Sequence, residues 1–75
     1  MDKASYEQSF RAEYRELSKR HKALCGIIAK HEAGIPDDDL PCSISLLSEQ
    51  CAVMGRYLSI LETRAIVENI ELKKQ

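Results

Sequence analysis

A row of cations in the first half of the chain is the feature best suited to binding chemistry. At steps of four, four and three residues it contains Arg11, Arg15, Lys19 and Lys22. Such steps keep side chains on one face of a helix. Guanidinium groups grip phosphates through paired N–H donors, so the row can form an anion site. A solvated charged face, partly balanced by nearby glutamates, is the simpler interpretation, and both stay open at this point.

Aromatic side chains accompany these cations. Tyr6, Phe10 and Tyr14 follow one another at steps of four, and Tyr57 precedes Arg64 by one heptad. An aromatic face beside an arginine can stack a base and hold its phosphate, which a nucleotide site requires. Core packing explains Phe10 more simply, and interface packing competes with ligand contact for the other tyrosines. The candidate ligand-binding residues are Arg11, Tyr14, Arg15, Arg56, Tyr57 and Arg64.

A thiol and an imidazole lie one helical turn apart at Cys25 and His21. With His31 or Cys51 they could ligate a metal ion, because this spacing places both groups on one face. A half-buried histidine and a small buried thiol explain the pair more simply, so we predict no metal centre and no cofactor. The three cysteines include no C-x-x-C pair, which favours free thiols in a reducing cytoplasm.

Composition excludes several functional classes. The sequence has no Gly-rich phosphate loop, no H-E-x-x-H and no G-x-S-x-G, so we predict a protein that is not an enzyme and has no catalytic residue. No apolar run approaches the roughly 20 residues that span a bilayer, which argues against a membrane partner. A net charge of -1 gives no excess of positive charge of the kind that binds long nucleic acid, so we predict no such partner.

Two seams of packing residues must position these side chains. The first contains Phe10, Tyr14, Leu17, His21, Leu24, Ile28 and His31. The second contains Leu47, Cys51, Met54, Leu58, Leu61 and Ala65. Steps of three and four keep one helical face towards a partner, which predicts an all-α fold, an antiparallel two-helix hairpin. We expect one domain over residues 1–75, with helix one at about 4–32, a turn at 33–42 and helix two at about 43–71.

The second helix carries more apolar surface than one partner helix can cover. Beside its seam runs another stripe, made of Leu46, Val53, Tyr57, Ile60 and Val67. Small helical scaffolds often compensate for a thin core by oligomerising. The surplus therefore predicts a homo-oligomeric helical bundle, although the spacing is compatible with a dimer and with a hexamer.

The element boundaries have their own signals. Gly34 followed by Pro36 is typical of a helix end, and Ser43 or Ser45 can cap the second helix. Gly55 lies inside that helix at a cost of about 1 kcal/mol relative to alanine, which is either tolerated or marks a close approach or ligand access.

The order of these residues resembles a known group. Phe10, the run Glu13–Leu17, Gln50, Met54, Tyr57 and Arg64 are arranged as in small helical proteins of tailed bacteriophages, including the crAss-like phages. The run from Tyr14 to Ser18 is similar to the opening of the hairpin domain in phage anti-CBASS and anti-Thoeris sponge proteins. Those sponges are helical oligomers, commonly hexamers, that sequester cyclic nucleotides or cyclic ADP-ribose signals without cleaving them.

The resemblance implies a phage anti-defence protein in the cytoplasm of the bacterial host cell. Its partners would be a small anionic nucleotide and further copies of the chain, and Tyr14 would contact the ligand. The family pattern places a lysine where this sequence has Ala29, with Lys30 one position later. That offset rotates a side chain by about 100° and changes the expected pocket.

Two other functions fit the same pattern. The spare stripe could cover a host or phage protein and inhibit it by direct binding, in which case a stoichiometric complex forms without any small ligand. A purely structural four-helix dimer is also compatible with the seams.

Overall fold

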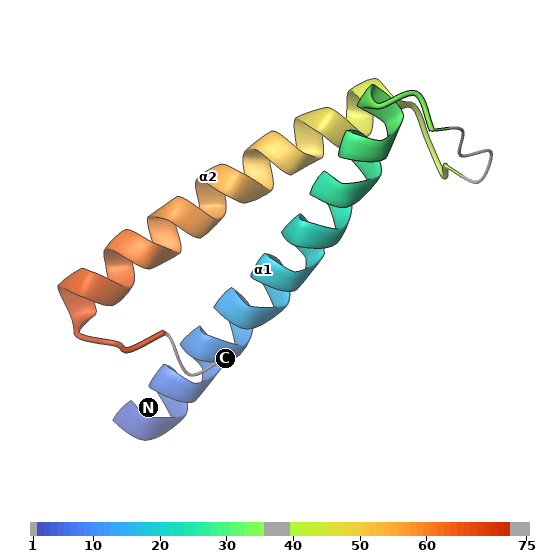
Figure 1. The fold of residues 1–75 in the computed structure, drawn as a ribbon. Helices are drawn as coiled ribbons and strands as arrows, with labels where there is room; N and C mark the ends of the chain where they lie inside the picture. Colours follow the sequence, from blue (N-terminus) through green and yellow to red (C-terminus); the bar gives the residue numbers. More distant parts are fainter. Residues whose placement is uncertain (1, 36–39, 73–75) are drawn as a thin grey trace.

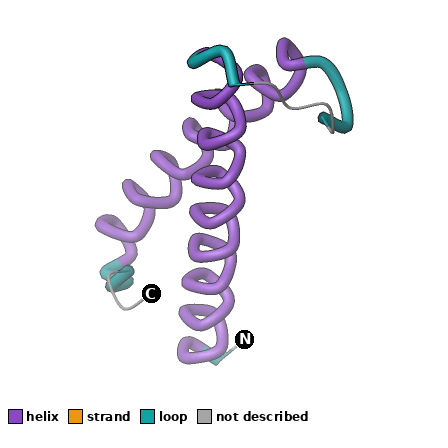
Figure 2. Tube along the Cα trace, turned by 45° about the vertical axis from the view of Figure 1, so that its right-hand side comes forward, coloured by secondary structure: helices purple, strands orange, loops and turns teal. Residues whose placement is uncertain are grey.

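Two helices form the chain in the computed structural model, which describes residues 2–35 and 40–72. Helix α1 spans Lys3–Glu32 and helix α2 spans Ile44–Glu68. They run antiparallel and pack against each other as a hairpin, which confirms the predicted helical pair (Figure 1). The start of α1 and the end of α2 lie at the same end of the molecule (Figure 2). Our expectation for Pro36 and the middle of the turn, residues 36–39, lies outside the described residues.

The predicted seams supply the core. Its buried residues are Phe10, Leu24, Leu47, Leu58, Leu61, Ala65 and Ile70. All except Ile70 belong to the two seams read from the sequence. Other seam positions, including Tyr14 and His21, are half-buried, whereas His31 is exposed. Helical spacing therefore identified the packed face of each helix, although it did not show which seam residues are fully buried.

Both ends of the connection use the expected capping residues. Gly34 has φ of 80°, and the N–H groups of Gly34 and Ile35 donate to the carbonyls of His31 and Lys30 at 3.0 Å. This pattern is the Schellman motif, which glycine adopts without steric penalty. At the start of α2 the Ser43 hydroxyl accepts from the Leu46 N–H at 3.2 Å, as an N-cap side chain does.

Helix α2 ends at Glu68, three residues before the position we expected from the sequence. Asn69 adopts a left-handed conformation with φ of 59°, and the Ile70 N–H donates to the Ala65 carbonyl at 2.8 Å. This second Schellman motif turns the chain back, and Ile70 enters the core beside Phe10, Leu61 and Ala65. The burial of the apolar Ile70 side chain offsets the helical hydrogen bonds that a further turn of α2 would have made.

The two helices come together near the connection and separate towards the termini (Figures 1 and 2). In the closer region, a Cβ placed on Gly55 would lie 3.3 Å from His21 Nε2. Large side chains and the returning segment fill the wider end, where Tyr6, Tyr14 and Leu72 pack against the core. The fold thus places Tyr6, Phe10, Tyr14 and Arg64 together at its open end.

The spare apolar stripe of α2 is exposed. We call it the α2 stripe, and it consists of Leu46, Val53, Tyr57, Ile60 and Val67. Every member is at least 40% exposed, and Val53 is 62% exposed. No helix in the described part of the chain is long and apolar enough to cross a membrane.

Candidate functional site

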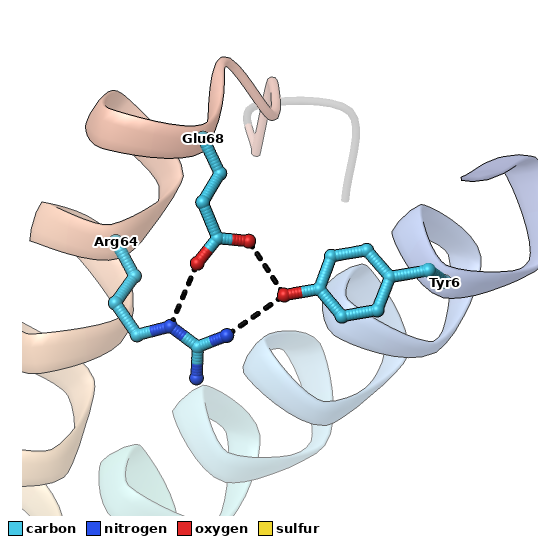
Figure 3. Close-up of polar contacts among 3 residues, drawn as sticks. All are labelled: Tyr6, Arg64 and Glu68. Atoms are coloured by element: carbon cyan, nitrogen blue, oxygen red, sulfur yellow. Dashed lines mark hydrogen bonds and ion pairs between the residues drawn. The ribbon is translucent and has the colours of Figure 1, made fainter. Parts of the chain in front are cut away.

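A tyrosine, an arginine and a glutamate join the two helices at the open end (Figure 3). Arg64 Nε donates to Glu68 Oε2 at 2.9 Å, and Arg64 Nη2 donates to the Tyr6 hydroxyl at 2.8 Å. Tyr6 in turn donates to Glu68 Oε1 at 2.5 Å. The Arg64 guanidinium also lies over the Phe10 ring, with Cζ 5.1 Å from its centroid. These contacts hold the Arg64 guanidinium in one orientation. They use its Nε and one N–H of Nη2, so its other N–H donors remain available.

The same contacts set the protonation of the cluster. The hydrogen bond to Glu68 is the main reason that the pKa of Tyr6 is raised above 10.0. Accepting from Tyr6 and then from Arg64 lowers the pKa of Glu68 below 4.5. At neutral pH the tyrosine is a neutral donor and the ion pair is fully charged, so Arg64 keeps its positive charge beside a satisfied carboxylate.

A shallow hollow on α2 begins at this arginine. We call it the arginine hollow, and its lining residues are Arg56, Ser59, Ile60, Thr63 and Arg64. It has a volume of about 330 Å³ and no carboxylate in its lining. Two guanidinium groups and two hydroxyls around an isoleucine suit an anion that also carries an apolar or aromatic part. Ser59 and Thr63 were missed by sequence reasoning, although their steps from Arg56 place them on its face.

Arg56 and Tyr57 are the more accessible members of this region. Both are exposed, and among the described residues neither side chain has a hydrogen bond or ion pair. Tyr57 is 40% exposed and belongs to the α2 stripe rather than to the lining of the arginine hollow. The Arg56 charge is therefore available to a ligand without first breaking an internal contact.

The candidate residues of α1 lie on the other flank of the hairpin. Tyr14 donates to Glu62 Oε2 at 2.6 Å, and this bond is the first cause of its raised pKa. Arg11 Nε donates to the Glu71 carbonyl at 2.8 Å and its Nη2 lies 3.6 Å from Glu7 Oε1. Arg15 is exposed, like Lys19 and Lys22 further along the row.

One chain does not bring all six candidates together. Glu62, the partner of Tyr14, precedes Arg64 by two positions on α2, which is a rotation of about 200° around the helix. Tyr14 therefore contacts one flank of α2, and Arg64 of the arginine hollow lies on the other flank.

The structure also brings together three potential metal ligands. The ligand atoms of His21, Cys25 and Cys51 all lie within 4.8 Å of one another. The exposed His31, which the sequence offered as an alternative ligand, is not in this group.

The fold and its hollow define a small helical-hairpin protein with two guanidinium groups and two hydroxyls gathered on α2. The chain belongs to the Sequestin family, whose model matches residues 4–67 and so covers nearly all of both helices. The family name refers to sequestration of a molecule, which means binding without conversion. No curated protein and no solved structure matches the chain.

Proposed function

We propose that this protein is a phage anti-defence sponge. It binds a cyclic nucleotide or a cyclic ADP-ribose immune signal in pockets between subunits and holds it without cleaving it. The observation that carries the proposal is the arginine hollow, whose lining contains two guanidinium groups and no carboxylate, in a chain of the Sequestin family. Sequestering a signal needs affinity alone, and the residues present supply hydrogen bonds and charge.

The proposed pocket combines two copies of the chain. Arg56 and Arg64 of one copy hold the phosphates, and Tyr57 stacks on the base. Arg11, Tyr14 and Arg15 of another copy close the pocket from the opposite side. The shallowness of the two hollows described on the hairpin supports this arrangement, because neither encloses a ligand by itself. Ligands prefer clefts that bury most of their surface, and subunit interfaces provide them.

Self-association is driven by the α2 stripe in this proposal. The stripe continues past the arginine hollow, since Ile60 belongs to both. Packing stripes of neighbouring copies together would therefore cover the apolar side chains and enclose the hollow in one step. The assembly is a homo-oligomer, and the hexamer of the phage sponges is our working expectation.

Removing single arginines tests the pocket. We expect Arg56→Ala and Arg15→Ala to weaken binding of cyclic dinucleotides or cyclic ADP-ribose by roughly tenfold to a hundredfold, because each loses a charge-assisted hydrogen bond. The measurement is calorimetric titration with a panel of both ligand classes, beside ligand-induced thermal stabilisation followed by circular dichroism. Arg64→Ala should behave similarly, with some loss of stability because Arg64 also bonds to Tyr6 and Glu68.

Arg20→Ala is the matched control. Arg20 is exposed on α1, outside the candidate set, and has only a surface ion pair with Glu16 at 3.3 Å. Such pairs contribute little to stability. Unchanged affinity in the Arg15 and Arg56 variants, or an equal loss in the control, would remove this site assignment.

The alternative function is inhibition of a host or phage protein by direct binding. A second hollow on α2, lined by Leu46, Glu49, Gln50, Val53 and Met54, favours it because the hollow lies on the apolar stripe rather than on the cations. This function predicts a stoichiometric complex with a macromolecule and no response to any nucleotide in the titration above.

A further inference from the structure

Two thiols and one imidazole meet between the helices, away from the arginine hollow. Cys25 Sγ lies 3.2 Å from Cys51 Sγ and 3.5 Å from His21 Nε2. His21 and Cys25 come from consecutive turns of α1, and Cys51 comes from α2. All three residues are half-buried, so they are accessible to a small ion but shielded from bulk solvent.

These separations are close to those of a tetrahedral zinc site. Bonds of about 2.3 Å to sulfur and about 2.0 Å to nitrogen give distances of roughly 3.5 to 3.8 Å between neighbouring ligand atoms. The 3.5 Å between Cys25 Sγ and His21 Nε2 matches the sulfur–nitrogen value, whereas the 3.2 Å between the two sulfur atoms is about 0.6 Å shorter than the sulfur–sulfur value. The ligand atoms of His21 and Cys51 lie within 4.8 Å of each other. Side-chain rotations that move the two sulfur atoms apart would bring the three ligand atoms towards bonding distance.

Gly55 keeps the space beside the imidazole open. A Cβ at this position would lie 3.3 Å from His21 Nε2, the atom that faces the thiols. That distance is tighter than ordinary van der Waals contact, so a Cβ here would require the imidazole to move by a few tenths of an ångström. The glycine, although it weakens the helix, leaves the imidazole in its present position beside the thiols.

We propose that His21, Cys25 and Cys51 bind one Zn²⁺ ion per chain. Two thiolates balance the charge of the ion, and the neutral imidazole completes three ligands from both helices. Among the described residues no fourth ligand belongs to this group, so water takes the remaining position. The ion links α1 to α2 in the half of the hairpin nearer the connection and stabilises a hairpin whose core is thin, as structural metals do in other small scaffolds.

Cobalt substitution tests the site directly. Reduced full-length protein is titrated with Co²⁺, which reports thiolate ligation by near-ultraviolet charge transfer and tetrahedral geometry by its visible bands. We expect saturation at one ion per chain, displacement of Co²⁺ by Zn²⁺, and a higher Tm with Zn²⁺ than with a chelator. No thiolate band, or no change in Tm, would overturn the proposal.

Variants assign the ligands. Cys25→Ser and Cys51→Ser should lose the charge-transfer band or weaken Co²⁺ binding by more than about tenfold, and His21→Gln should shift the visible bands. Cys42→Ser is the matched control, because Cys42 is exposed and outside the group, and it should titrate like the unmodified protein. An equal loss in Cys42→Ser, or a Cys25–Cys51 disulfide in place of metal binding under reducing conditions, would contradict the assignment. Neither result bears on nucleotide binding at the arginine hollow.

Discussion

Val53→Asp is expected to dissociate the proposed homo-oligomer into folded single chains. Val53 lies in the middle of the α2 stripe, is 62% exposed in the hairpin and has no place in its core. In an assembly that buries the stripe, the new carboxylate would lose its hydration without gaining a partner. That cost is at least about 3 kcal/mol per interface, or more than a hundredfold in the dissociation constant. Sedimentation velocity over a range of concentrations measures the change.

Ala52→Asp serves as the control, because it adds the same charge one residue away, at an exposed position outside the stripe. Its oligomeric state should match that of the unmodified protein. Circular dichroism should show that Val53→Asp keeps its helices. If the unmodified protein is already a stable single chain, or if both variants dissociate equally, the α2 stripe is not the interface.

Leu61→Ala is expected to cause the largest loss of stability. Leu61 is 1% exposed and belongs to the cluster with Phe10, Ala65 and Ile70. Truncating a buried leucine removes its transfer free energy and leaves a cavity, which together cost about 2 to 5 kcal/mol. For a hairpin of this size that is a large share of the folding free energy. Urea unfolding at a fixed protein concentration measures it, since the proposed self-association would make the apparent stability depend on concentration.

Ile66→Ala provides the comparison within the same helix. Ile66 is 79% exposed, and surface substitutions usually change the free energy of unfolding by no more than about 0.5 kcal/mol. A similar loss for both variants would mean that the described core is not what stabilises the chain.

The helical pair was predictable because the apolar residues that define it recur at a fixed spacing and because the signals at the helix ends lie within a few residues. Phe10 belongs to the helical repeat of the first seam, and Leu47, Leu58 and Leu61 belong to that of the second. Each of these residues is buried, as the seams predicted. Gly34 and Ser43 end and begin their helices through backbone geometry and a short side-chain bond, which depend on few neighbours. Such features follow from residue type and spacing alone.

The end of α2 and the cluster around Arg64 were less accessible from the sequence. Asn69 is a weaker stop signal than glycine, and it ends the helix here because the turn allows Ile70 to reach the core. Tyr6 was noted as an aromatic neighbour of the cations. Its bonds to Arg64 and Glu68 join residues 58 and 62 positions apart, a distance that no local pattern encodes.

The cysteine and histidine group shows a similar division. The spacing of His21 and Cys25 put both on one face of a helix, and the sequence offered Cys51 as one of two further ligands. Only the packing of the two helices chose Cys51 over His31. The close approach of Gly55 to His21 was likewise not predictable, because it depends on which α1 side chain faces Gly55 when the helices pack.

Native mass spectrometry of the protein purified from bacteria that produce cyclic nucleotide or cyclic ADP-ribose signals tests the central claim most directly. It reports the number of subunits and any retained small molecule in the same spectrum. Our account predicts a homo-oligomer above the dimer that carries the added mass of bound nucleotide. A single chain, or a dimer without any bound molecule, would contradict it.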